Sequence, residues 1–331
     1  MTTTANSQDF LFQRIKEMLP QYVSMVDAVS EILHVSNDSA YRRIRGETPL
    51  VLEEAWVLCR HFNLSLDHLL EAKNDSVLFR NIRVRNQEYT YRQYLQGLHL
   101  QMEAINNFMQ KEIIYMSKDL PIFHNFYFKP LIAFRYFFWM KTHLAHPDFE
   151  KMQFSFDILP PDIEQMSMDL TRHYCNVPST EMWNTESINS TISQIEFSKD
   201  SGHFSNAADS KKIYEALEET IYHMKEQAEY GCKFMPGEDP QSKKPNFKFF
   251  FNRVVLGDNT IMTITDNVKS AIINYGHLNY IMTNDESFCN DLFGDFENLI
   301  RRSTQISQTS EKQRNLFFNI LLTKIQDRKR N

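Results

Sequence analysis

The sequence predicts a multidomain protein, with an all-α five-helix domain first, then a helical connector, then an α+β or α/β domain. A chain of 331 residues is longer than one ordinary small domain. Short helical patterns follow one another closely from residue 9 to residue 72, whereas helical and strand patterns mix beyond residue 113. The predicted domains are therefore residues 1–75, 76–112 and 113–331.

Start and stop signals mark the helices of the first domain. Pro20 ends the first helix, because proline cannot continue one. Ser36 is a good N-cap for the third helix, and Gly46 closes it. The five helices are predicted at about residues 10–19, 24–33, 36–46, 52–61 and 65–71.

The connector is basic at its start and amphipathic afterwards. Arg80, Arg83, Arg85 and Arg92 outnumber the single acid Glu88. A helix is then predicted over about 92–112, because apolar residues recur there at steps of three and four. Its apolar stripe, which also suggests a dimerisation helix, consists of Tyr94, Leu98, Met102, Ile105 and Met109.

The last domain mixes helices and strands. Gly257-Asp258-Asn259 is a turn signal between two strand patterns and predicts a hairpin. The proline-rich stretch 233–246 and the polar stretch 199–207 are predicted loops. Strands are predicted at 113–116, 247–255, 260–265, 270–275 and 278–283, and helices at 127–142, 186–198, 208–229, 286–301 and 311–328.

Composition favours a cytoplasmic protein. The chain is 42% hydrophobic with a net charge of -6, so a sizeable core can form and overall charge does not indicate nucleic acid. The N-terminus lacks an apolar signal core, and the most apolar run, Leu131 to Met140, is too short for a membrane span and contains Arg135. The widely spaced cysteines, which predict reduced thiols, are Cys59, Cys175, Cys232 and Cys289.

No motif announces an enzyme, a cofactor or a metal. GxSxG, GxxxxGK[ST], GxGxxG and HExxH are all absent, and only 8 glycines are available for phosphate-binding loops. His143 and His146 have HxxH spacing, but spacing supplies no third ligand, so ordinary histidines are expected. The aromatic run from Phe123 to Trp139 is interpreted as core, with a ligand pocket as the alternative.

Residues 26–46 have the pattern of a helix-turn-helix. Ser30 is small where the second helix must cross the first, and Val35 is apolar just after the turn. Ala40 and Ile44, four residues apart, form the buried face of the second helix. The other face is therefore left for the major groove of DNA.

The outward side chains have the chemistry of base and phosphate recognition. Arginine pairs with guanine, asparagine with adenine, and aspartate accepts from cytosine. Residues early in the helix are expected near bases, whereas Arg43 and Arg45 are expected to hold phosphates. The predicted DNA-binding residues are Ser36, Asn37, Asp38, Ser39, Tyr41, Arg42, Arg43 and Arg45.

The run from Val26 to Leu70, with VSNDSAYRRIRG and then FNLSLDHLL, resembles the Cro/XRE-type helix-turn-helix family of phage-repressor-like regulators. The resemblance covers about a fifth of the chain and implies a sequence-specific transcriptional regulator. His34 stands at the turn position that the family usually gives to glycine, so it must adopt a positive φ or use a different turn. The recognition helix also fits the family only with one residue inserted early and one lost late.

The leading hypothesis is a homodimeric regulator that binds double-stranded DNA at a two-fold operator and has a C-terminal domain for effector sensing or oligomerisation. The sequence identifies no effector. Two alternatives remain: a ligand-binding or catalytic C-terminal module with subordinate DNA binding, and an antitoxin-like interaction scaffold. A deep apolar pocket with convergent polar groups between residues 113 and 300 would favour the first alternative.

Overall fold

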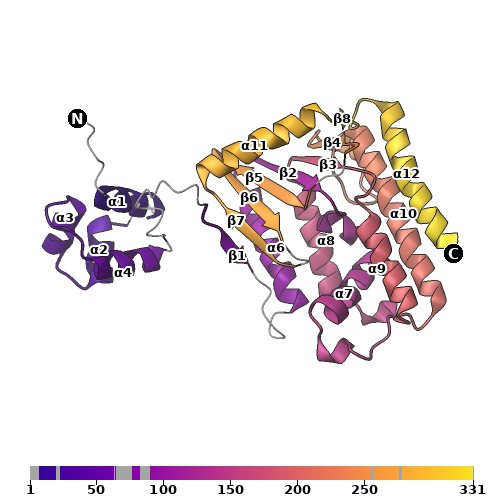
Figure 1. Ribbon diagram of the computed structural model, residues 1–331, viewed down its shortest axis with the longest axis horizontal. Coiled ribbons are helices and arrows are strands. Elements are labelled where there is room, and N and C mark those ends of the chain that lie inside the picture. The colour runs from indigo at the N-terminus through magenta and orange to yellow at the C-terminus, as the bar shows by residue number, and fades with distance from the viewer. Residues whose placement is uncertain are drawn as a thin grey trace. The chain divides into compact units, whose positions relative to one another are not determined.

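The computed structural model divides the chain into two compact units, Met1–Leu78 and Phe79–Asn331 (Figure 1). The residues that the structure describes are 7–19, 23–62, 64, 77–82, 90–254, 257–275 and 278–330.

The described part of the first unit consists of short helices around one small core. They are α1 (Ser7–Met18), α2 (Met25–Leu33), α3 (Asn37–Ile44) and α4 (Leu52–Phe62). These helices correspond to the first four predicted ones, and the fifth, at 65–71, lies outside the described residues. The buried side chains that they share are Leu11, Phe12, Ile15, Val29, Ala40, Leu58 and Cys59.

The second unit is built on a mixed sheet. Within the described residues eight strands pair in the order β1-β7-β6-β5-β2-β3-β4-β8. The β2–β3 and β3–β4 pairs are parallel, and the other pairs are antiparallel. The strands are β1 (Arg80–Ile82), β2 (Lys111–Ser117), β3 (Ser179–Trp183), β4 (Phe247–Phe251), β5 (Thr260–Thr265), β6 (Val268–Asn274), β7 (Tyr280–Thr283) and β8 (Thr304–Gln305).

The hairpin predicted at Gly257-Asp258-Asn259 is wrong. β4 pairs with β3 and β8, whereas β5 pairs with β2 and β6. The tight hairpin lies instead between β5 and β6, where Thr265 pairs with Val268 and Asp266 has a φ of 50°. A turn sequence lets the chain reverse, but buried side chains on the strands determine which strands become neighbours.

Alternating side chains place the two faces of this sheet in different cores. On one face Ile114 of β2 and Met262 of β5 pack with Phe296 of α11 (Glu286–Arg301). On the other face Ile113 and Phe249 join the main core of the unit. That core is shared with α6 (Tyr91–Asn106), α7 (Lys129–Phe138), α8 (Pro161–Cys175), α9 (Asn189–Asp200), α10 (Ala207–Tyr230) and α12 (Glu311–Arg330).

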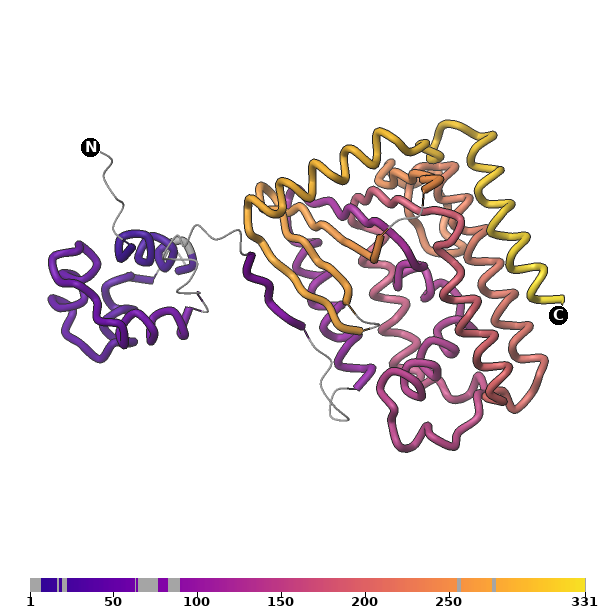
Figure 2. Tube along the Cα trace, in the orientation of Figure 1, coloured from indigo at the N-terminus to yellow at the C-terminus, as the bar shows by residue number. Residues whose placement is uncertain are grey.

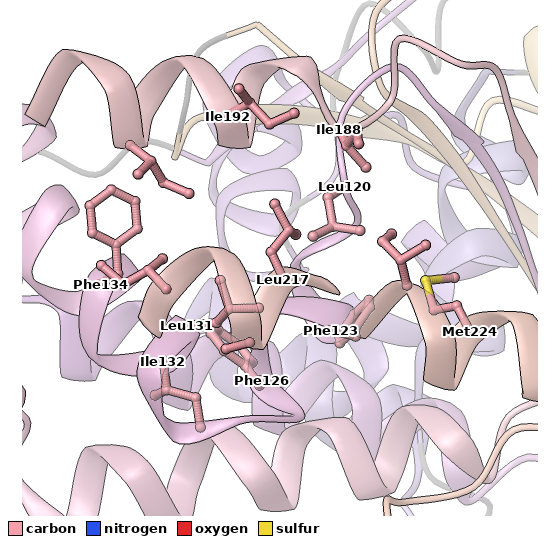
Figure 3. Close-up of a cluster of buried hydrophobic side chains, with 14 of the residues drawn as sticks. Leu120, Phe123, Phe126, Leu131, Ile132, Phe134, Ile188, Ile192, Leu217 and Met224 are labelled. Carbon is pink, nitrogen blue, oxygen red and sulfur yellow. The ribbon is translucent and has the colours of Figure 1, made fainter. Parts of the chain in front are cut away.

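The second unit is therefore layered. Among its described helices, α11 alone covers one face of the sheet and the others are stacked on the opposite face, as the ribbon and the tube both show (Figure 2). Aromatic side chains fill the main core. Phe123, Phe126 and Phe134 lie close to Leu217 of α10 and Ile192 of α9 (Figure 3). The aromatic run of the sequence is thus largely core.

The connector predicted at 76–112 is not a separate part, because the second unit begins at Phe79. Tyr91 and Leu95 of α6 are buried, and α6 packs along α8. Its apolar stripe lies against its own unit, apart from Met109, which follows the helix and is 94% exposed. Of the basic residues, Arg83 and Arg85 lie outside the described residues.

Other elements match the sequence prediction closely or were not predicted. The helices at 186–198, 208–229, 286–301 and 311–328 correspond to α9, α10, α11 and α12. The helix at 127–142 is α7, which continues into a π-helical turn at Trp139–His143. α8, β1, β3 and β8 were not predicted. No helix among the described residues is long and apolar enough to cross a membrane.

Candidate functional site

The turn between α2 and α3 is fixed by caps on both sides. His34 ends α2 with φ 55° and ψ 41°, so this residue adopts the left-handed conformation that the sequence allowed as one option. The Val35 amide donates to the carbonyl of Ser30 at 3.0 Å. Ser36 caps α3, because its Oγ accepts from the amide of Ser39 at 3.2 Å. These contacts set the angle at which α3 leaves α2.

The buried face of α3 is the predicted one. Ala40 is fully buried, and Ile44 packs partly buried against the core of the first unit. Of the predicted DNA-binding residues, Ser39 and Arg43 are half-buried. The exposed ones are Ser36, Asn37, Asp38, Tyr41, Arg42 and Arg45.

Contacts within the unit restrain some of these exposed side chains. The Asn37 amide donates to Asp27 Oδ1 of α2 at 2.9 Å, which holds its side chain beside the turn. Arg45 lies over the ring of Tyr41, with its guanidinium carbon 5.6 Å from the ring centroid. Arg42 and Arg45 lie 3.9 and 3.6 Å from the carboxylate of Glu47. Such exposed ion pairs are weak and exchange readily for a phosphate.

Arg43, expected to hold a phosphate, has another role in the structure. Its Nε and Nη2 donate to the two carboxylate oxygens of Glu54 in α4, at 2.9 and 2.8 Å. Its Nη1 donates to the carbonyl of Ser39 at 3.1 Å. The hydrogen bond from Arg43 lowers the pKa of Glu54 despite partial burial. The side chain is 17% exposed and holds α3 to α4.

Gln8 of α1 is a positioning residue that sequence reasoning missed. Its amide nitrogen donates to the carbonyls of Arg43 and Thr48, at 2.7 and 2.9 Å. Its amide oxygen accepts from the backbone of Leu50 at 2.9 Å. One side chain therefore ties α1 to the segment that follows the outward face of α3. The sequence offers no signal for this, because a lone glutamine in a helix is usually a surface residue.

The second unit contains a pocket of about 180 Å³ between α6 and the sheet. Its walls come from α6, β2, β5, β6 and the segment 119–125, with Trp139 and α9 completing it. Gln101 of α6 donates to the hydroxyl of Tyr280 on β7 at 2.6 Å and links two walls. The principal apolar lining residues are Leu98, Ile105, Ile113, Phe123, Trp139 and Ile261.

One buried cation lies in the lining of this pocket. Arg135 of α7 is 6% exposed, and its Nε donates to Asn125 Oδ1 at 2.8 Å. Its two Nη atoms donate to Thr191 Oγ1 at 2.6 Å and to Gln194 Oε1. Burial lowers the pKa of Arg135 to about 10, so the guanidinium remains charged at neutral pH. The only sequence signal was an arginine inside an otherwise apolar run.

A second buried polar cluster is centred on Glu181 of β3, which has no exposed surface. Its carboxylate lies 2.9 and 3.0 Å from His124 Nε2 and accepts from Trp183 Nε1 at 2.8 Å and from the Tyr174 hydroxyl. Burial alone would raise the pKa of Glu181, but these donors outweigh it and hold the pKa below its usual range. The carboxylate is thus anionic and interacts with three donor side chains.

Lys233 and Cys175 complete this cluster. The Lys233 ammonium lies 3.6 Å from the centroid of the Tyr174 ring and has no hydrogen-bond acceptor among the described residues. Burial lowers the pKa of Lys233 to about 8 and raises the pKa of the Cys175 thiol to about 11. Cys175 is therefore not a thiolate nucleophile at neutral pH. None of Glu181, His124 and Lys233 belongs to the described lining of the pocket.

No metal centre is apparent in the described part of the chain. Those residues contain no group of three or more His, Cys, Asp or Glu side chains able to hold a metal ion. His146 instead accepts from the amide of Asp148 at 3.4 Å as a local cap.

Comparisons of the chain with protein-family models, with curated proteins and with solved structures found no significant match. The chemistry of the two sites is therefore the basis on which a function is assigned. The first site is an exposed helix after a capped turn, and the second is an apolar pocket with a buried cation.

Proposed function

We propose that this protein is a sequence-specific DNA-binding transcriptional regulator whose second unit binds a small-molecule effector. The observation that carries the proposal is the geometry of α3. A short capped helix buries Ala40 and turns Arg42 and Arg45 outward. Side chains that leave a helix in this way can reach base edges and phosphates in a major groove.

The contacts within the first unit suggest a different role in DNA binding for each of the three arginines of this segment. Arg42 is 56% exposed in its side chain and is assigned to bases, and Arg45, 59% exposed, is assigned to phosphates. Arg43 is assigned to positioning, since its bidentate pair with Glu54 occupies it. Asn37 and Tyr41 are further candidates for base contacts.

The effector part of the proposal rests on the pocket of the second unit. This pocket has apolar walls and convergent polar groups, the features expected if the second unit binds a ligand. A regulator with separate DNA-binding and ligand-binding units changes its DNA affinity only if the ligand prefers one state of the protein. We also propose a homodimer on a two-fold site, the arrangement by which helix-turn-helix dimers bind two half-sites.

The test is an in vitro selection of random DNA duplexes by the purified full-length protein at low salt, followed by gel-shift titration. The expected result is a palindromic consensus, whose half-sites lie about 34 Å apart for a two-fold dimer. Recovery of DNA without any sequence preference would contradict the proposal. A stable protein partner that competes with DNA for α3 would favour an interaction scaffold instead.

A further inference from the structure

We infer that the pocket beneath α6 binds a small monocarboxylate with an apolar or aromatic body, and that Arg135 receives the carboxylate. This inference rests on the proposed function for its biological meaning, since the carboxylate would be the effector. It stands on its own as a statement of which ligand the pocket takes. Its support is the charge, hydrogen bonding and size of the pocket.

Arg135 forms no direct ion pair with any described residue, although the carboxylate of Asp119 acts on it at longer range and raises its pKa. In the described part of the chain, no carboxylate lies within ion-pair distance of this guanidinium. Its acceptors Asn125, Thr191 and Gln194 are all neutral. A buried cation without a directly paired anion is costly, because neutral dipoles and a more distant carboxylate replace its hydration only in part. An anionic ligand bound to the guanidinium would supply the direct ion pair.

The guanidinium also retains donors for a ligand. A guanidinium has five N–H groups. Three of those on Arg135 go to Asn125, Thr191 and Gln194, and the other two have no acceptor among the described residues. The three neutral acceptors fix the orientation of the fork, and Arg135 belongs to the lining of the pocket. A carboxylate is the planar acceptor that matches such a fork.

Size and the remaining charge restrict the ligand further. A cavity of about 180 Å³ is close to the roughly 150 Å³ of an engineered cavity that binds benzene, so one ring or a short alkyl chain fits. Asp119 is the other charged residue of the described lining. It is half-buried, and its carboxylate accepts from Asn259 at 3.3 Å. Its negative charge disfavours a second anionic group on the ligand.

The decisive experiment compares acids with their own amides on the full-length protein without DNA. Isothermal titration calorimetry is run with phenylacetate, 3-phenylpropionate and hexanoate and with the three corresponding primary amides. At least one acid is expected to bind on the order of tenfold more tightly than its amide, because only the acid pairs with Arg135. If no acid binds, or if each amide binds as tightly as its acid, the inference is overturned.

Two variants locate the binding. Arg135→Met should erase the preference for acid over amide, whereas Arg172→Met, which removes a half-exposed arginine of the same unit, should leave it unchanged. Ile261→Trp keeps Arg135 but fills the pocket, and should abolish binding of the acid. Unchanged acid binding in a folded Ile261→Trp protein would show that the acid binds elsewhere, which overturns the inference even if Arg135→Met fails to fold.

The two proposals fail separately. If acids bind through Arg135 but the protein shows no DNA sequence preference, the pocket assignment is kept and the proposal of a DNA-binding regulator is rejected. If a DNA consensus is found but no acid binds, the regulator is kept and the pocket assignment is rejected.

Discussion

The two units use charge in opposite ways. In the first unit the side chains of Arg42 and Arg45 are more than half exposed and pair with the exposed acid Glu47, and Arg45 also contacts Tyr41. In the second unit Arg135 and Glu181 are buried among aromatic residues and held by specific donors and acceptors. An exposed arginine can exchange its weak partner for a phosphate, whereas a buried charge is available only to a ligand that enters.

This difference explains why each unit suits a different partner. DNA is a large polyanion and needs charges that project beyond the protein surface. A small molecule needs an enclosed site where one charge acts at low dielectric. Substitution of exposed charges should therefore affect binding with little effect on stability, and substitution of buried charges should affect stability first.

The largest expected effect is on the stability of the second unit in Glu181→Ala. The substitution leaves His124, Tyr174 and Trp183 without their common acceptor and Lys233 without a nearby anion. Loss of one member of such a buried cluster costs about 3–5 kcal/mol of unfolding free energy. Urea unfolding followed by tryptophan fluorescence measures it. The exposed Glu229, also in the second unit, provides the control Glu229→Ala, which should stay within about 0.5 kcal/mol of the parent. Equal stability of the two variants would contradict the contrast between buried and exposed charge.

A somewhat smaller effect is expected from pH, through His223 of α10. Burial lowers the pKa of His223 to about 4, whereas an unfolded histidine has a pKa near 6.5. Between pH 6.5 and pH 4, His223 binds a proton more readily in the unfolded chain than in the folded one. The unfolding free energy therefore falls as pH falls, and at pH 4 it is about 3 kcal/mol lower than above pH 6.5. The urea midpoint should follow this slope in the parent and lose most of it in His223→Gln. Glu181 has a lowered pKa, so its ionised form stabilises the fold at any pH above the usual pKa range of a carboxyl group. That contribution is lost only at still lower pH, which separates it from the effect of His223. A parent midpoint that is flat from pH 6.5 to 4 would contradict the assignment to His223.

The smallest effects in free energy concern DNA. Arg42→Ala should weaken binding to the selected site by about 1–3 kcal/mol and relax the preference at one base position. Arg45→Ala should weaken all sequences about equally and reduce the salt dependence of binding. Gel-shift titrations at several salt concentrations separate the two patterns. Neither variant should change the unfolding free energy by more than about 0.5 kcal/mol, since both side chains are exposed. Identical behaviour of the two variants would remove the distinction between base contact and phosphate contact.

Local features could be predicted well from the sequence. The cap at Ser36 and the buried Ala40 depend on neighbours within a few residues, so pattern alone located α3. The long helices α10 and α12 were found for the same reason. The predicted turn at Gly257 shows the limit, since the strand pairing it implied is absent.

What could not be predicted depends on residues far apart in the chain. Glu181 meets His124 across 57 positions, and Arg135 meets Thr191 across 56. The helical pattern predicts an outward Arg43, and only the fold shows that this side chain pairs with Glu54. Single charges in apolar surroundings, such as Arg135 in its aromatic run and Glu181 beside Trp183, were the available signals. They indicate that a partner exists without indicating which residue it is.

The burial of Glu181 also affects the register of β3 against its two parallel neighbours, β2 and β4. In the observed alignment Glu181 lies opposite Tyr115 of β2 and Phe249 of β4. A shift of one residue would turn the carboxylate to the opposite face, where Met182 now packs with Leu299 and Ile300 of α11. There the Asn252 amide and the Ser303 hydroxyl, which now contact Met182 Sδ, would replace the aromatic and histidine donors that hold the carboxylate. The exchange leaves an ionised carboxylate less well satisfied, so misaligned states are penalised as the sheet assembles. The single buried carboxylate of Glu181 thereby favours the observed strand register over its one-residue shifts.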